Sequence, residues 1–66
     1  MNLFVNGESA SAAEGTTVQT LLEQMGLPQK GLAVERNREI VPRSLYATTR
    51  IADGDRIEIV QFVGGG

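Results

Sequence analysis

The spacing of apolar residues near the N-terminus predicts a β-hairpin. Met1, Leu3 and Val5 fall on one face of an extended chain, and the pair Asn6-Gly7 follows at once. This dipeptide favours the two-residue turn that joins antiparallel strands. We therefore expect a strand over residues 1–6 and a second over 8–13. The serines and alanines of the second strand are typical of a weakly held edge strand.

Apolar residues then recur at helical spacing. Four of them lie at i, i+3, i+4 and i+7 within residues 18–25, which predicts a helix with one apolar face. Thr16 followed three residues later by Gln19 fits a capping box at its start. Gly26 stands where a left-handed residue ends a helix, and a Schellman ending would fold Leu27 back onto the last turn.

The second half of the chain is typical of strands and turns. A strand is predicted over 32–36, and after a turn at Asn37-Arg38 a short strand resumes at 40–41 and stops at Pro42. Residues 43–50 show no regular pattern, so a short helix and a loop both remain possible there. Asp53-Gly54-Asp55 predicts another turn, and residues 56–63 form the longest strand pattern.

This order of elements predicts an α+β fold. A single helix covers one face of one sheet, and if it crosses over from the second strand to the third, the first and last strands lie side by side at the centre. This is the β-grasp, or ubiquitin-like, fold: a mixed four- to five-stranded sheet with one main helix packed on one face. We expect residues 1–63 to form this domain and residues 64–66 to form a flexible C-terminal tail.

The predicted core combines the helix stripe with the inward-facing strand residues. A chain of 66 residues buries only about 60% of its unfolded surface, so this core is small and leaves little room for a deep active site. It consists of Leu3, Val5, Val18, Leu21, Leu22, Met25, Val34, Ile40, Leu45, Ile51, Ile57 and Ile59.

Composition excludes several kinds of function. The sequence has no Cys and no His, which removes thiolate nucleophiles, the commonest general base and the usual zinc ligands. A net charge of −2 argues against a nucleic-acid partner. No apolar run is long enough for a membrane span, and no signal peptide is evident. We therefore expect a cytoplasmic protein without a membrane or metal partner.

The charged and hydroxyl residues favour structural roles. Asp53 and Asp55 flank a turn glycine, where carboxylates commonly bond their own backbone, and hard cations need more oxygen ligands than this pair supplies. The mixed charges at 35–39 are typical of a solvated surface. Thr16 and Thr17 have no neighbouring base, so helix capping is their expected role.

The C-terminal residues have no evident role in folding. Gly64, Gly65 and Gly66 lose the most backbone entropy on ordering and bury no side chain. A frayed end is one interpretation. In the other, a tail without side chains extends about 10 Å, threads a narrow channel and delivers the carboxylate of Gly66 to another protein's active site.

The last strand adds a possible docking surface beside this tail. Val60 and Phe62 share the strand face opposite to Ile57, and Phe4 lies beside them if the first and last strands pair. An exposed apolar patch of Phe4, Val60 and Phe62 would indicate a partner-binding site. In the alternative, residues 42–50 cover this face.

Five segments spread over essentially the whole chain carry a family resemblance. They are Asn2-Leu3-Phe4-Val5-Asn6-Gly7, Thr17-Val18-Gln19-Thr20-Leu21-Leu22, Ala33-Val34-Glu35-Arg36-Asn37-Arg38-Glu39-Ile40-Val41-Pro42-Arg43, Asp53-Gly54-Asp55-Arg56-Ile57-Glu58-Ile59-Val60 and Phe62-Val63-Gly64-Gly65-Gly66. Together they resemble the sulfur carrier proteins of thiamine biosynthesis, the ThiS family of small β-grasp proteins.

The resemblance implies a carrier that is a cosubstrate and not an enzyme. A ubiquitin-activating-like adenylyltransferase, using its own ATP and Mg²⁺, would adenylate the Gly66 carboxylate. Sulfur from a cysteine desulfurase or sulfurtransferase would then give a thiocarboxylate, which thiazole synthase would consume. The carrier itself would bind no cofactor. A carrier for molybdopterin or tRNA thiolation, and a β-grasp interaction module with an inert tail, are the alternatives.

Overall fold

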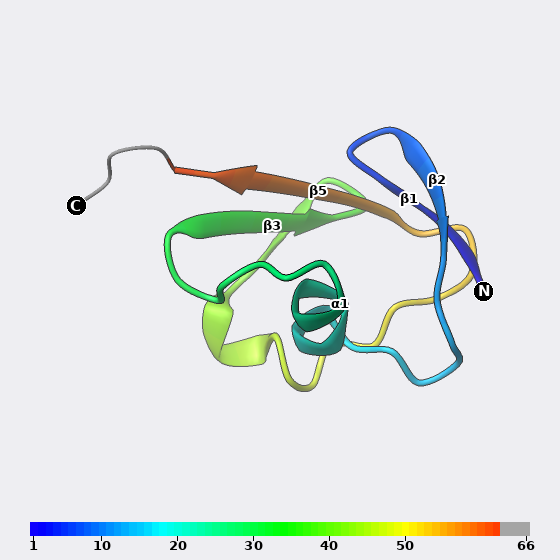
Figure 1. Cartoon of the computed structure of the whole chain (residues 1–66), viewed down its shortest axis with the longest axis horizontal. Helices are drawn as coiled ribbons and strands as arrows, with labels where there is room; N and C mark the ends of the chain where they lie inside the picture. The colour runs from blue at the N-terminus through cyan, green and yellow to red at the C-terminus, as the bar shows by residue number, and fades with distance from the viewer. Residues whose placement is uncertain (63–66) are drawn as a thin grey trace.

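The chain forms one mixed sheet with a helix against one face (Figure 1). The computed structural model describes residues 1–62. The first hairpin consists of β1 (Asn2–Val5) and β2 (Glu8–Ser11), and helix α1 (Val18–Gln24) follows. The remaining elements are β3 (Leu32–Arg36), β4 (Glu39–Val41), a 3₁₀ turn η1 (Arg43–Leu45) and β5 (Arg56–Gln61).

The sheet confirms the predicted topology. Its strand order is β2-β1-β5-β3-β4, and β1 and β5 pair in parallel at the centre while the other pairs are antiparallel. Within residues 1–62, five strands and one α-helix make the fold an α+β β-grasp. The strands are shorter than expected at 1–6, 8–13 and 56–63, although residue 63 lies outside the described residues.

Both hairpin turns follow from the residues at their corners. Asn6 and Gly7 have φ values of 50° and 83°, and Asn37 and Arg38 have 52° and 70°. Two successive left-handed residues make the turn whose twist matches that of paired strands, and Asn and Gly adopt this conformation at little cost. The turn at Asn37-Arg38 is thus confirmed, although Arg38 occupies a conformation that few side chains favour.

The helix ends as predicted but begins one residue later. The N–H groups of Gly26 and Leu27 donate to the carbonyls of Glu23 and Leu22, at 3.0 and 2.9 Å, which is the Schellman pattern. The predicted cap at Thr16 and Gln19 is wrong, because Thr17 caps the helix and exchanges hydrogen bonds with Thr20.

Thr16 is held by a different set of contacts. It is buried, its hydroxyl donates to the carbonyl of Ala13 at 2.7 Å, and its own carbonyl accepts from Ile51 at 2.9 Å. These bonds hold Thr16 against neighbouring loops, and Thr17 is the residue that caps the helix.

Most of the predicted core is confirmed, with three errors. Met25, Ile40 and Leu45 are exposed, and Val5 is half-buried. Met25 is the C-cap that follows the helix. Ile40 and Leu45 are each followed by a residue that faces inward in their place. Burial instead includes Leu32, Val41 and Tyr46. The core consists of Leu3, Val18, Leu21, Leu22, Leu32, Val34, Val41, Tyr46, Ile51, Ile57 and Ile59.

Asp55 is a buried carboxylate that joins three parts of the fold. It is 6% exposed and accepts hydrogen bonds from Arg36 Nε at 2.6 Å, Asn37 Nδ2 at 3.0 Å and the Ala52 N–H at 2.8 Å. Its backbone carbonyl accepts from the Phe4 N–H at 2.9 Å. The structural role expected for Asp55 is therefore confirmed, and Arg36 is an ion-pair partner instead of a purely solvated charge.

The pKa of Asp55 follows from these contacts. Burial raises the pKa, but the hydrogen bonds from Ala52, Asn37 and Arg36, with the Arg36 charge, lower it by more, so it lies below the ordinary 3.8. A lowered folded-state pKa stabilises the fold above the unfolded-state value, and this contribution is lost as pH falls through the folded-state value.

We therefore predict that Asp55→Asn lowers the free energy of unfolding by about 2 kcal/mol at pH 7, because charged hydrogen bonds to a buried group are lost. As the pH falls below the ordinary Asp value of 3.8, the native chain is expected to lose more stability than the variant. Urea unfolding at several pH values measures both effects. Equal acid sensitivity of the two proteins would contradict the assigned role.

Candidate functional site

The described residues contain no cluster suited to metal binding. Among residues 1–62, no three His, Cys, Asp or Glu side chains lie close enough together to hold a metal ion. Asp53 accepts from the N–H of Asn2 at 2.7 Å, and Asp55 is saturated as described above. Residues 1–62 also include no helix that is long and apolar enough to cross a membrane. The candidate site is therefore a surface.

Strand alternation sorts the side chains onto two faces of the sheet. On one face, Val5 pairs with Ile57 and Val34 with Ile59, and these residues pack under the helix. The opposite side, which we call the open face, carries Phe4, Val60 and Phe62. These three side chains are 36%, 58% and 58% exposed, so residues 42–50 do not cover them.

The register separates Phe4 from the other two residues. Phe4 lies opposite Arg56, whose guanidinium carbon is 4.9 Å from the centre of its ring. Val60 lies four residues further along β5, about 13 Å at the usual rise of a strand. Val60 pairs with Ala33, and the N–H of Phe62 donates to the carbonyl of Gly31 at 2.8 Å. Phe4 therefore lies at the other end of β5 from Phe62.

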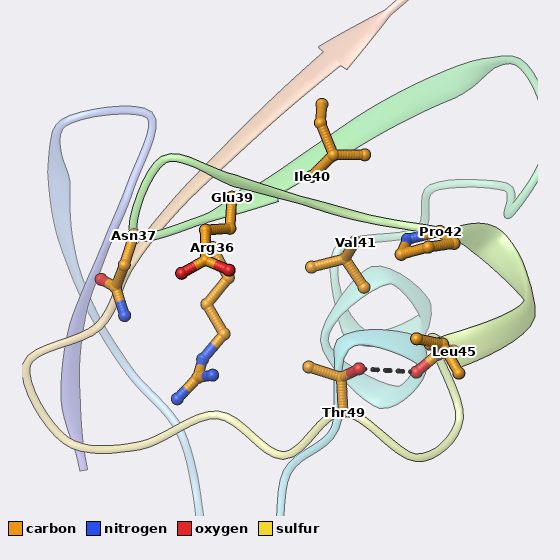
Figure 2. Close-up of a pocket in the computed structure, with 8 residues that line it drawn as sticks. All are labelled: Arg36, Asn37, Glu39, Ile40, Val41, Pro42, Leu45 and Thr49. Atoms are coloured by element: carbon orange, nitrogen blue, oxygen red, sulfur yellow. Dashed lines mark hydrogen bonds between the residues drawn. The ribbon is translucent and has the colours of Figure 1, made fainter.

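Ile40 belongs to the open face and not to the core. It is 66% exposed and pairs with Glu35, which in turn pairs with Glu58. Figure 2 shows Ile40 and Val41 pointing to opposite sides of β4, with Val41 directed toward the helix. The sequence pattern did not predict this placement, because Ile40 and Val41 are consecutive apolar residues on opposite faces of a strand. Either of them could have faced inward.

The open face thus carries an apolar patch near the C-terminal end of β5. It is flanked by the carboxylates of Glu35 and Glu58, which face each other across β3 and β5. Like charges opposite each other destabilise a sheet slightly, and a basic group from a partner would relieve that cost. We call this surface the distal patch, and it consists of Ala33, Ile40, Val60 and Phe62.

A hollow of about 220 Å³ lies beside β4 and η1 (Figure 2). Two of its polar side chains make structural bonds: Arg36 Nε binds Asp55, and the hydroxyl of Thr49 donates to the carbonyl of Leu45 at 2.8 Å. Glu39 and Asn37 also line the hollow, and among the described residues it holds no acidic cluster that could bind a metal ion.

The tail residues, predicted to thread a partner's active site and to end in the reactive carboxylate of Gly66, lie outside the described residues. This applies to Gly64, Gly65 and Gly66, and to the boundary expected between residues 63 and 64. The structure describes the strand that leads to them, whose last paired residue is Gln61, opposite Leu32.

Comparison with known proteins places the chain in a family. The model of the ThiS family matches residues 3–66. The chain belongs to the ThiS family. It is 39% identical to the sulfur carrier protein ThiS of Escherichia coli over the whole of both chains. It is 43% identical to the sulfur carrier protein ThiS of Bacillus subtilis, over 97% of this chain and 98% of that one.

Two further comparisons extend this result. A crystal structure of ThiS from Geobacter metallireducens covers 100% of both chains with a TM-score of 0.85 and 38% identity. A thiazole synthase of Paramagnetospirillum magneticum is 48% identical over the whole of this chain, which spans only 20% of that protein. The ThiS family resemblance drawn from the sequence is thus confirmed, and so is its β-grasp fold.

The placement of Ile40 and Val41 gives a matched pair of variants on one strand. Val41→Ala is expected to lower the free energy of unfolding by about 2 kcal/mol, because Val41 is a core side chain. Ile40→Ala is expected to change it by less than about 0.5 kcal/mol, because Ile40 projects from the open face. Urea unfolding of both variants checks the assignment, which would fail if Ile40→Ala were the more damaging change.

Proposed function

We propose that this protein carries sulfur as a thiocarboxylate on Gly66 and donates it to thiazole synthase in thiamine biosynthesis. The main support is its end-to-end similarity to proteins named sulfur carrier protein ThiS. The sequence also contains no Cys, so sulfur cannot be held as a persulfide on this chain. A carboxyl group activated by another enzyme needs no thiol of its own.

The proposed chemistry begins with adenylation. A carboxylate oxygen of Gly66 attacks the α-phosphate of ATP and releases pyrophosphate, on a ubiquitin-activating-like adenylyltransferase that holds ATP and Mg²⁺. Sulfur from a cysteine desulfurase or sulfurtransferase then attacks the acyl carbon and displaces AMP. When that sulfur comes from a persulfide, a thiol reduces the resulting acyl disulfide to the thiocarboxylate. The carrier is a cosubstrate, and it binds no cofactor itself.

In this proposal the tail delivers the reactive carboxylate and the sheet docks the carrier on its partner. Gly64 and Gly65 have no side chains, so a narrow channel in a partner admits them and brings Gly66 to the reacting groups. The distal patch docks the carrier beside the mouth of that channel through Ile40, Val60 and Phe62, whose apolar area is exposed. Basic partner residues are expected to face Glu35 and Glu58.

Thiazole synthase is the proposed acceptor. The chain matches a segment making up one fifth of two proteins named thiazole synthase, from Paramagnetospirillum magneticum and Magnetococcus marinus. A carrier segment inside a synthase chain supports the idea that the two act on the same intermediate. The cytoplasm is the proposed location, since ATP-dependent activation takes place there.

The first prediction from this proposal concerns Gly66. Protein purified from its native host is expected to contain a fraction in which one oxygen is exchanged for sulfur, because the proposed product is a thiocarboxylate. Intact-mass and fragment mass spectrometry measure the exchange and assign it to Gly66. Its complete absence, with the activating enzyme present, would refute the carrier proposal and favour an interaction module.

Deletion of Gly65 and Gly66 provides the control. The truncated chain is expected to unfold at nearly the same temperature, since no core side chain is lost, but to accept no sulfur. Growth of a strain that lacks the gene for this protein then identifies the product that receives the sulfur. A requirement for thiamine supports thiazole synthesis, whereas normal growth without thiamine and a loss of molybdopterin or tRNA thiolation would point to another acceptor.

Docking through the distal patch gives a second prediction. Phe62→Ala is expected to weaken binding to the adenylyltransferase or the synthase by roughly tenfold, because an aromatic anchor is removed. Phe4→Ala is the matched control and is expected to have a smaller effect, since Phe4 packs against Arg56 at the other end of β5. Isothermal titration calorimetry compares them. An equal loss of affinity in both variants would contradict the assignment of docking to the distal patch without Phe4.

A further inference from the structure

The outer edge of β2 has unpaired backbone groups. Met1 and Ala12 exchange two hydrogen bonds, of 2.8 and 3.0 Å, so in this antiparallel pair Ala10 and Glu8 also direct their backbone groups toward β1. Ser9 and Ser11 therefore direct their N–H and C=O groups away from β1. No other segment among residues 1–62 pairs with this edge, because β2 is the first strand in the sheet order.

Several of the features that usually prevent pairing with another chain are absent from this edge, although β2 is short, at four residues, and carries one charged side chain, Glu8. β2 contains no Pro and no Lys, and its register with β1 runs without a bulge. Natural proteins commonly use such features to block an exposed edge. The edge is consequently open to an added strand.

A groove runs beside this edge, between β2 and helix α1. It has a volume of about 370 Å³, and its apolar walls are Val5, Ala10, Leu21 and Met25. Met25, placed in the core by its spacing, is 43% exposed because it lines this groove. Glu8 is the charged side chain at the groove.

We propose that β2 and this groove bind an extended segment of a partner protein by strand addition. The added strand runs antiparallel to β2, and its backbone pairs with Ser9 and Ser11. One large apolar side chain lies opposite Ala10, in the groove against Leu21 and Met25. A basic side chain follows two residues later, opposite Glu8, because alternate residues of a strand share a face.

A second copy of this chain fits the groove poorly. If two β2 strands paired about a twofold axis, the side chains over the groove would be those of Ala10 and Glu8. A methyl group would leave most of the groove unfilled, and a carboxylate would be buried against apolar walls at a cost. The groove therefore favours a foreign segment with larger apolar side chains.

The position of the edge allows this partner to bind while the tail is engaged. Two strand spacings separate β2 from β5, and β1 pairs only with Arg56 and Ile57 at the start of β5. In Figure 1, β2 lies on the side of the N-terminus, whereas β5 points away from it. A partner on β2 can hold the carrier without covering the distal patch.

The test uses two blocked peptides that differ at one position. The basic peptide is Gly-Ser-Leu-Ser-Leu-Ser-Arg-Ser-Gly, and the acidic one has Glu in place of Arg. In NMR titrations the basic peptide is expected to shift the amides of Ser9 and Ser11 and the methyl of Met25, and to bind about tenfold more tightly than the acidic one. Glu8→Lys is expected to reverse this preference.

Variants of Ser9 distinguish strand addition from binding in the groove by side-chain contacts alone. Ser9→Pro removes an outward N–H without disturbing the ladder to β1, and it is expected to weaken the basic peptide at least about fivefold. Ser9→Thr keeps the N–H and is expected to bind normally. The circular dichroism spectrum and urea unfolding of each variant confirm that it is folded.

Several outcomes would overturn the proposal. They are the absence of binding at millimolar peptide, shifts confined to the distal patch, an unchanged preference in Glu8→Lys, and self-association of the chain through β2. Deleting Gly65 and Gly66 is expected to leave peptide binding intact, so this test does not depend on sulfur transfer.

Discussion

The carboxylate of Asp55 is the contact on which the arrangement of the sheet most depends. It binds Arg36 at the end of β3, Asn37 in the following turn and its own turn at Ala52, while its carbonyl holds β1 at Phe4. These groups come from segments that are distant in sequence. A polar group inside so small a core is tolerated because each of its acceptor oxygens has a partner. One residue, through its side chain and its backbone carbonyl, thereby aligns the start of β5 with both of its neighbours.

The side-chain amide of Asn37 extends this arrangement. Its oxygen accepts from the N–H of Arg56 at 3.0 Å while its backbone N–H donates to the carbonyl of Arg56 at 2.8 Å. At the other hairpin, Asn6 acts in a similar way and exchanges hydrogen bonds with the backbone of Ile59. In both places an asparagine in a left-handed conformation forms a turn. It also hydrogen-bonds to β5 just after its own strand, β3 or β1, has ended.

Local patterns in the sequence predicted the fold well, because the turns and the helix stripe depend on residues close together. The errors arose where one residue of offset decides the outcome. Either Ile40 or Val41 could face the helix, and only pairing with β3 selects Val41. The predicted apolar patch of Phe4, Val60 and Phe62 depends on long-range register instead, since the register of β1 against β5 sets Phe4 beside Arg56, four residues before Val60. The exposure of Met25 in the groove depends on how far α1 lies from β2. These two elements are separate in the sequence, so no local pattern predicts that distance.

The central position of β5 has a consequence for how the protein is made. Val5 lies beside Ile57, more than fifty residues later in the chain, and this pairing joins the two halves of the sheet. A chain still being synthesised holds only the first hairpin, the helix and the β3–β4 hairpin, with their apolar faces unmatched. The sheet closes only after the ribosome releases β5. Chains that lack this strand leave the apolar faces of the two halves of the sheet unmatched, and such exposed surface favours misfolding and aggregation.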